Sequence, residues 1–298
     1  MTMTTATHLS SPLARPARRR PRRTWRKLGL YAGIAAIALW CLGPFYWMVV
    51  TAFRDVGYTF DTTPWPAHVS FDNFRTVFDT SRGNHFGQAL LNSMVIGIAV
   101  TVLAMVLGGL AAYALARLHV RGKFLVLGVV LGASMFPGVA LVTPLFQLFT
   151  GIHWLGTYPA LILPEISFAL PLAVWILTSF FAEMPWELEQ AARIDGCTAA
   201  QAFRLVILPL AAPALFTTAI LVFISSWNEY LLSSLLANGN PDVAPVTVAI
   251  ANFTGTLPHQ EPYTAVMAAG AVVTIPLVAL VLAFQRRIIS GLTAGAIK

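Results

Sequence analysis

The stretch from Pro185 to Pro213 reads PWELEQAARIDGCTAAQAFRLVILPLAAP, a polar segment between hydrophobic runs long enough to cross a bilayer. Its pattern predicts two short helices. Leu188, Ala191 and Ala192 recur at helical spacing and form a small apolar face on the first helix. Gly196 is expected to end that helix, because glycine adopts positive φ without steric penalty.

The second helix of this stretch is expected to begin at a capping box, in which Thr198 is followed three residues later by Gln201. An apolar stripe with the spacing i, i+3, i+4, i+7 should follow, made of Phe203, Val206, Ile207 and Leu210. A membrane protein that exposes such a pair of short helices between its spans is expected to contact a partner through them.

The composition is that of an integral membrane protein. Hydrophobic residues make up 57% of the 298 residues and charged residues only 10%, whereas ordinary soluble domains are about 25% charged. The net charge of +7 arises mainly at the N-terminus, where eight of the 19 Lys and Arg residues lie within residues 1–27. Such a run before a span is typical of a cytoplasmic anchor on anionic lipid. Nucleic-acid binding is not expected, because no aromatic or fold motif accompanies the charges.

Hydrophobic runs predict six transmembrane helices. They cover about residues 28–53, 88–115, 124–149, 158–181, 210–236 and 264–284, with prolines at positions 137 and 144 interrupting the third. A short amphipathic helix starting at Ser70 is expected to lie on the membrane surface. Residues 237–263 are expected to form a second exposed loop.

The distribution of Lys and Arg predicts the orientation. Basic residues cluster in residues 1–27, in residues 117–123 and near the C-terminus, so the positive-inside rule places both termini in the cytoplasm. The polar stretch, at about 185–209, then also lies in the cytoplasm. The predicted domains are a disordered basic tail (1–27), a six-span domain (28–289) and a C-terminal tail (290–298).

The polar stretch resembles the EAA loop of ABC importer permeases, in the pattern E-x-A-A-x-x-D-G…F-x-x-V-x-L-P-L-x-x-P. The matching positions are Glu189, Ala191, Ala192, Asp195, Gly196, Phe203, Val206, Leu208, Pro209, Leu210 and Pro213. The sequence WNEY at Trp227–Tyr230 and the terminal QRRIISGLTAGAIK are similar to the shorter partner of maltose-type carbohydrate permease pairs, nearest the second permeases of actinobacterial trehalose importers. The resemblance covers Leu28–Lys298. Position 190 departs from it, because Gln190 stands where many members have a second Glu.

The resemblance implies an all-α integral membrane fold of six transmembrane helices with a cytoplasmic coupling-helix loop. That loop would dock into a cleft of a separate ATPase through Glu189, Gln190, Ala191, Ala192, Asp195, Gly196 and Phe203. The chain lacks the G-x-x-x-x-G-K-[ST] phosphate loop. ATP and Mg²⁺ are therefore expected on an ATPase dimer, with no cofactor in this chain. The other implied partners are a second permease subunit, an extracytoplasmic sugar-binding protein and the lipid bilayer.

Two further groups are candidate sites. Trp227, Asn228 and Glu229 lie in the fifth predicted span, where Glu229 could line the transport pathway, pair with the other permease or make a structural hydrogen bond. The resemblance implies that the loop of Asn252, Phe253, Thr254, Gly255 and Thr256 reaches into the external binding protein, the alternative being a solvated loop.

The side chain of Glu165, in the fourth predicted span, is expected to extend, or snorkel, to the outer membrane interface. The six histidines lack metal-ligand spacing, so no metal site is expected.

The expected function is that of a non-catalytic permease subunit of an ATP-driven carbohydrate importer in the bacterial cell membrane, with a disaccharide such as trehalose or maltose as its cargo. An ABC permease for another polar solute, such as glycerol phosphate, is the first alternative. An ion-coupled secondary transporter usually carries an inverted internal repeat, which this sequence does not show. A membrane enzyme would need a clustered catalytic set, which is also missing.

Overall fold

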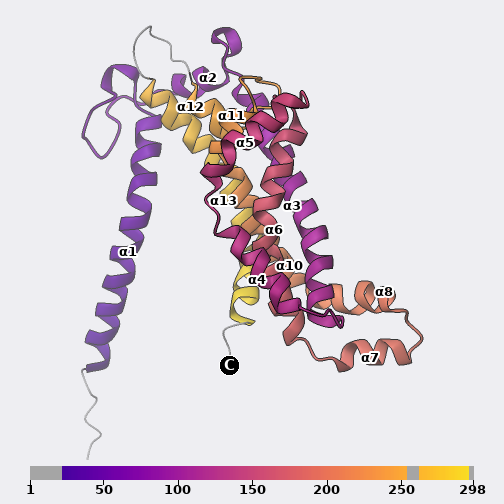
Figure 1. The fold of residues 1–298 in the computed structure, drawn as a ribbon. Helices are drawn as coiled ribbons and strands as arrows, with labels where there is room; N and C mark the ends of the chain where they lie inside the picture. The colour runs from indigo at the N-terminus through magenta and orange to yellow at the C-terminus, as the bar shows by residue number, and fades with distance from the viewer. Residues whose placement is uncertain (1–21, 254–261, 295–298) are drawn as a thin grey trace, which may run out of the picture. The chain divides into compact units, whose positions relative to one another are not determined.

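The computed structural model describes residues 22–253 and 262–294, and within them every regular element is a helix. The predicted all-α membrane fold is thereby confirmed. The longer helices, which dominate Figure 1, are α1 (Arg22–Ala52), α3 (Phe86–Arg117), α4 (Lys123–Ser134), α5 (Gly138–Gly151), α6 (Tyr158–Glu183), α10 (Ala212–Trp227) and α13 (Tyr263–Ala294). Most of the predicted N-terminal tail, the loop residues Thr254, Gly255 and Thr256, and residues 295–298 lie outside the described part.

The chain divides into two units within α1. The first unit ends at Trp47 and contains most of that helix, with Pro44 inside it, and the second begins at Met48. The segment Lys27–Ala52 is long and apolar enough to cross a membrane by itself. All the other elements belong to the second unit.

Four described helices, α1, α3, α6 and α13, can each cross a membrane, and two bent helix pairs would raise the number to six. In the first pair, α4 and α5 meet at 86°. The third predicted span is therefore broken. Pro137 directly precedes α5, where a missing N–H is harmless, whereas Pro144 is accommodated inside α5.

The fifth predicted span is shorter than expected. Its helix α10 ends at Trp227, and after a break of three residues α11 (Leu231–Leu236) follows. The expected exposed loop of residues 237–263 contains the helix α12 (Val246–Ala251), in which Val246 and Val248 are buried. Apolar side chains of α12 fill the core, so this segment is part of the packed fold rather than a simple solvated loop.

The amphipathic helix predicted from Ser70 onward is α2 (Asp72–Phe78), but it packs on the protein. Asn73 is buried, and its Nδ2 donates to the carbonyl oxygens of Ala52 at 2.8 Å and Arg54 at 2.7 Å. These carbonyls lie at the end of α1 and have no partner inside that helix. The buried side chain of Asn73 thus fixes α2 on the protein by satisfying these carbonyls, and the expectation that this helix lies on the membrane surface stays a prediction.

Helix α3 is the centre of the second unit and packs along both α6 and α10. Two glycines allow this close approach. A Cβ atom at Gly108 would lie 3.1 Å from the Cβ of Ala173 in α6, and one at Gly97 would lie 2.9 Å from the ring of Phe223 in α10. Small residues serve the same purpose at many membrane helix interfaces. Gly108 and the adjacent Gly109 both face α6.

We expect Gly97→Val to destabilise the protein by about 1–3 kcal/mol, because the added side chain must displace the buried ring of Phe223. The midpoint of thermal unfolding of the detergent-solubilised protein measures this effect. Gly128→Val in α4 is the matched control, since nothing lies within 4 Å of a Cβ there. Equal midpoints for the two variants would contradict the close packing of α3 on α10.

Candidate functional site

The polar loop, residues 185–209, contains α7 (Glu187–Ile194) and α8 (Ala199–Ala202), which lie together at one end of the second unit in Figure 1. Both predicted helix boundaries are confirmed. Gly196 has φ of 91°, a left-handed conformation that glycine tolerates, and it directly follows Asp195, the C-cap of α7. The Thr198 side chain accepts from the N–H of Gln201, and the Gln201 side chain accepts from the N–H of Thr198.

The apolar stripe after α8 differs from the expected one because the helix widens. Residues Phe203–Ile207 form a π-helical turn, followed by the short α9 (Leu208–Leu210). Pro209 has no N–H and its ring would clash with a carbonyl one turn earlier in a regular α-helix. The wider turn rotates the following residues, so Leu210 is 48% exposed and Ala211 is buried in its place.

A buried carboxylate holds the polar loop on α3. Glu189 is only 1% exposed. Its Oε1 accepts hydrogen bonds from the hydroxyl of Tyr113 at 3.1 Å and from the guanidinium of Arg193 at 2.9 Å. The ring of Phe203 packs 4.4 Å from that of Tyr113, centroid to centroid. One tyrosine of α3 thus contacts both α7 and the π-turn. Buried ionised groups need such partners, because an unpaired charge in a protein interior is costly.

The last residue of α3 fixes the start of the polar loop. Arg117 is 6% exposed and donates to the carbonyl oxygen of Met184 at 2.6 Å. Its guanidinium also lies 5.3 Å from the ring centroid of Trp186, a cation–π contact. The polar loop is therefore attached to α3 at two points, and α3 and the loop are expected to move together.

The structure separates the seven predicted docking residues into two groups. Glu189 and Ala192 are buried, and Phe203 is half-buried against α3 and α6. The exposed members, which another protein could reach directly, are Gln190, Ala191, Asp195 and Gly196. The residue that departs from the family pattern, Gln190, thus lies on the exposed face, while the retained carboxylate of Glu189 faces inward.

The predicted group Trp227, Asn228 and Glu229 lies at the break between α10 and α11. Trp227 is 2% exposed and stacks on Phe223, so it belongs to the core. Asn228 is exposed and its side chain donates to the carbonyl of Ile224 at 2.7 Å. The Oε1 of Glu229 accepts from the N–H of Leu232 at 2.8 Å and so caps α11. This is the structural hydrogen bond that was one of the interpretations of Glu229.

The expectation that Glu165 snorkels to the outer interface was wrong. Glu165 is 6% exposed, and its carboxylate accepts a hydrogen bond from the hydroxyl of Ser226 in α10. Together with Ser225 and Glu229 these residues line a small cavity of about 40 Å³ between α6 and α10. Glu165 points inward because α10 supplies a hydroxyl donor there, which no pattern within α6 reveals.

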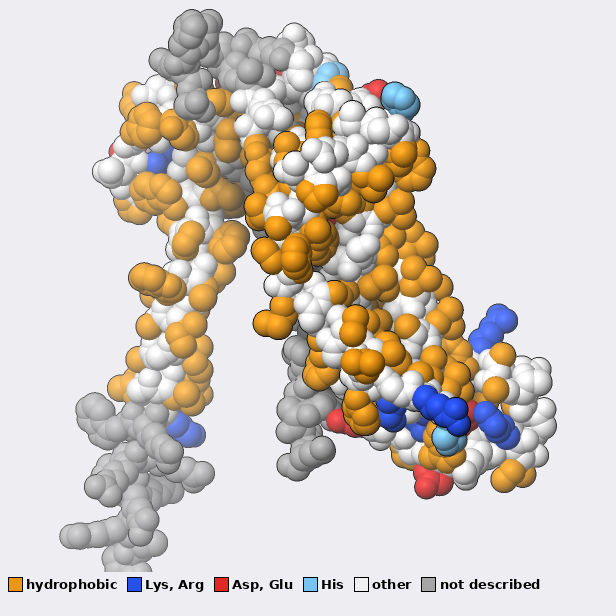
Figure 2. Space-filling view, in the orientation of Figure 1, with side chains coloured by type: hydrophobic (Ala, Val, Ile, Leu, Met, Phe, Trp, Pro, Cys, Tyr) orange, Lys and Arg blue, Asp and Glu red, His pale blue; other side chains and the backbone are white. Residues whose placement is uncertain are grey.

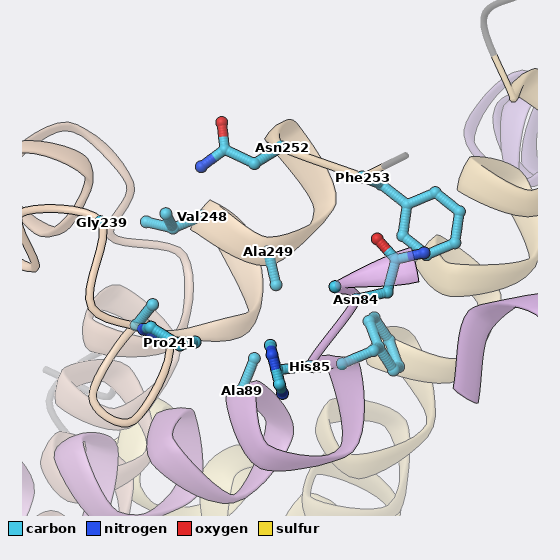
Figure 3. A pocket seen from close by; sticks show the side chains of 12 residues that line it. Asn84, His85, Ala89, Gly239, Pro241, Val248, Ala249, Asn252 and Phe253 are labelled. Atoms are coloured by element: carbon cyan, nitrogen blue, oxygen red, sulfur yellow. The ribbon is translucent and has the colours of Figure 1, made fainter. Parts of the chain in front are cut away.

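At the end opposite the polar loop, the described part of the predicted binding-protein loop consists of Asn252, which is exposed, and Phe253, which is 9% exposed. Both line a cavity of about 160 Å³ between α12 and the start of α3. Figure 3 shows Ala249 of α12 facing His85 and Ala89 across this cavity. The backbone of α12 thus carries Asn252 to the surface while Phe253 is anchored in the core.

Asn92 holds this end together and was not predicted from the sequence. It is fully buried in α3, and its Nδ2 donates to the carbonyl of Ala244 at 2.9 Å. Its Oδ1 accepts from the hydroxyl of Tyr158 at 2.7 Å. The N–H of Val246 donates to the neighbouring Ser93 hydroxyl at 2.8 Å. Polar residues inside a membrane helix are rare enough to be a signal, and Asn92 could have been found in this way.

Residues 104–293 match the family model described as "Binding-protein-dependent transport system inner membrane component". The matched region covers the polar loop, α10 and most of α13, and it is more than half of the chain. The protein belongs to this family of ABC importer permeases. The membership confirms the resemblance inferred from the EAA-type pattern. It also makes the chain a membrane transport component rather than an enzyme.

Two curated relatives are similar to this permease over nearly their full lengths. The trehalose transport system permease protein SugB of Mycobacterium tuberculosis is 50% identical over 260 residues, which cover 87% of this chain and 93% of the relative. The trehalose/maltose transport system permease protein MalG of Thermococcus litoralis is 42% identical over 276 residues, which cover 92% and 97%. These identities show a common family and a common length.

Among solved structures, the fold of the permease is similar to that of a bacterial ABC transporter involved in the import of the acidic polysaccharide alginate. The TM-score is 0.73 at 21% identity, covering 93% of this chain and 99% of the other. A second structure, the alginate transporter in complex with an alginate pentasaccharide-bound periplasmic protein, gives a TM-score of 0.67 at 16% identity. At these identities the likeness concerns the fold alone.

We expect Glu189→Ala to loosen the polar loop of this permease, because Tyr113 and Arg193 both lose their acceptor. Hydrogen bonds to a charged group contribute about 1.5–3 kcal/mol, so tryptic cleavage after Arg193 should become about tenfold faster or more. Timed digestion of the purified permease followed by mass spectrometry measures the rate. Glu187→Ala is the matched control, since Glu187 is exposed on the same helix. Equal cleavage of both variants would refute the anchoring role.

Proposed function

We propose that this permease is one of two transmembrane subunits of an ATP-driven sugar importer that takes up a disaccharide of the trehalose or maltose type. The cargo is inferred from the relatives, because the two that are 50% and 42% identical are named for trehalose and for trehalose or maltose. A relative that is 36% identical is named for sulfoquinovosyl glycerol, another polar glycoside. The family membership argues against an ion-coupled secondary transporter.

The proposed complex contains a second permease subunit, an ATPase dimer and an extracytoplasmic sugar-binding protein. ATP and Mg²⁺ would be held by the ATPase, and this chain would supply no cofactor. The distribution of basic residues supports placing both termini and the polar loop in the cytoplasm. The end formed by α12 and residues 252–256 would then face the binding protein. Asn252 is the described residue of that segment whose side chain is exposed for such a contact.

The observation that carries the proposed coupling mechanism is the attachment of the polar loop to α3. We infer that the exposed face of α7 and the Gly196 turn seats in a cleft of the ATPase. Closure of the ATPase dimer would pull on α7, and the bonds from Glu189 to Tyr113 and from Met184 to Arg117 would pass this displacement to α3. Because α3 packs on α6 and α10, the spans would then turn as a unit between inward-facing and outward-facing states.

The structure supports distinct roles for the predicted site residues. We assign ATPase contact to Gln190, Ala191, Asp195 and Gly196, which are exposed, and anchoring to Glu189, Ala192 and Phe203. We assign pathway or subunit-interface contact to Asn228, the exposed residue of its group. An amide at position 190 offers hydrogen bonds but no charge, so docking would rest on shape and on the carboxylate of Asp195.

Ala191→Trp should reduce recovery of the ATPase with affinity-tagged permease about tenfold or more, because a bulky side chain on the exposed face of α7 prevents close helix approach. The amount of permease in the membrane should not change, since the residue is exposed. Ala251→Trp, at an exposed alanine at the end of α12, is the matched control. Full recovery of the ATPase with Ala191→Trp would overturn the assigned docking face.

The cargo is tested on the intact complex. We expect the reconstituted importer to hydrolyse ATP faster when its binding protein is loaded with trehalose or maltose than when it is offered glycerol 3-phosphate, because a loaded binding protein favours the catalytically competent state of such complexes. ATPase activity in proteoliposomes measures the difference. Stimulation by glycerol 3-phosphate alone would contradict the disaccharide and indicate a phosphate-bearing cargo. The assignment as a subunit of an ATP-driven importer would not change.

A further inference from the structure

A basic cavity lies beside the polar loop, where α3 ends and α4 begins. Its volume is about 1170 Å³, and its basic lining residues are Arg117, His119, Arg121 and Lys123, with Trp186 forming one wall. None of the eight residues that line it is acidic. Figure 2 shows Lys and Arg side chains gathered at this end of the second unit, adjoining a surface that is largely hydrophobic. The cavity therefore presents positive charge at the boundary of the apolar surface.

The basic residues of the cavity differ in how firmly they are held. Arg117 is buried and fixed between Met184 and Trp186. Arg121 is exposed and Lys123 half-buried, and neither forms an ion pair with any residue that the structure describes. Arg117 is thus held by contacts within the protein, whereas Arg121 and Lys123 remain available to bind an external anion.

Exposed apolar side chains continue directly from these cations along α4. Phe124 is 79% exposed and Leu125 is 74% exposed, and the Nζ of Lys123 lies 5.5 Å from the ring centroid of Phe124. The pair of helices α4 and α5 is apolar enough to be a membrane span. Cations therefore stand at the start of an exposed apolar helix, an arrangement that matches a phospholipid with its phosphate above its acyl chains.

We propose that this cavity binds the phosphate headgroup of an anionic phospholipid, with Arg121 and Lys123 as the contacting cations. The proposal rests on the cytoplasmic orientation of the polar loop given above, because anionic lipids are concentrated in that leaflet. An acidic protein surface fits less well, since it would leave Phe124 and Leu125 beside water rather than acyl chains. Because Arg117 and Trp186 also hold the start of the polar loop, the bound lipid would support the segment that carries α7.

The test uses the intact detergent-solubilised importer and native mass spectrometry. The probes are phosphatidylglycerol and phosphatidylcholine with identical acyl chains, and we expect the wild-type complex to retain phosphatidylglycerol preferentially. The variant R121Q/K123Q should lower that retention about tenfold while leaving phosphatidylcholine unchanged, because the two cations supply the charge-dependent part of binding. The charge-conserving variant R121K/K123R should retain the anionic lipid. Arg204→Gln, an exposed arginine of the polar loop outside the cavity, should retain it as well.

Four results would overturn the proposal. One is equal retention of the two lipids by the wild type, and another is undiminished phosphatidylglycerol on R121Q/K123Q. Loss of the ATPase from R121Q/K123Q with lipid retention intact would assign the cavity to the ATPase surface instead. Displacement of the lipid by millimolar inorganic phosphate would make the site one for soluble phosphate. Lipid retention is read without transport, so its outcome is independent of the sugar and ATPase tests.

Discussion

Close packing of α3 between α6 and α10 is the constraint on which the rest of the structure depends. It is permitted by the absence of side chains at Gly97 and Gly108. Once α3 is held there, its polar residues have fixed positions relative to the neighbouring segments. Asn92 lies where the segment before α12 needs a donor, and Tyr113 lies where α7 needs one. One helix therefore organises both ends of the molecule.

The two ends use polar contacts for the same physical reason. In a largely apolar protein, backbone carbonyls and carboxylates that leave water must find donors inside the fold. Ala244 and Met184 accept from side chains of α3, and Glu189 accepts from Tyr113. Such bonds have directions, whereas apolar packing alone would let the polar loop slide on α3. The bonds are what make the loop suited to transmit a displacement.

The same geometry joins the proposed coupling path to the proposed lipid site. Arg117 ends α3, holds the first residues of the polar loop and forms part of the basic cavity. The ATPase contact and the lipid contact would therefore act on the same segment. A membrane composition rich in anionic lipid would favour the ordered position of Trp186, and through it the position of α7.

The sequence by itself determined the membrane class, most of the spans, the helix boundaries within the polar loop and the family. These follow from local properties, namely hydrophobic length, the conformational freedom of Gly196 and the capping box at Thr198. Tertiary structure alone decided which side chains face inward. Glu189 and Glu165 are buried because Tyr113 and Ser226, far away in the chain, supply donors to them. Leu210 is exposed and does not continue the predicted apolar stripe, because the π-helical turn before Pro209 rotates the residues that follow it. Periodicity shows that a face exists, but the partners that bury it come from distant segments, and only the folded chain brings them together.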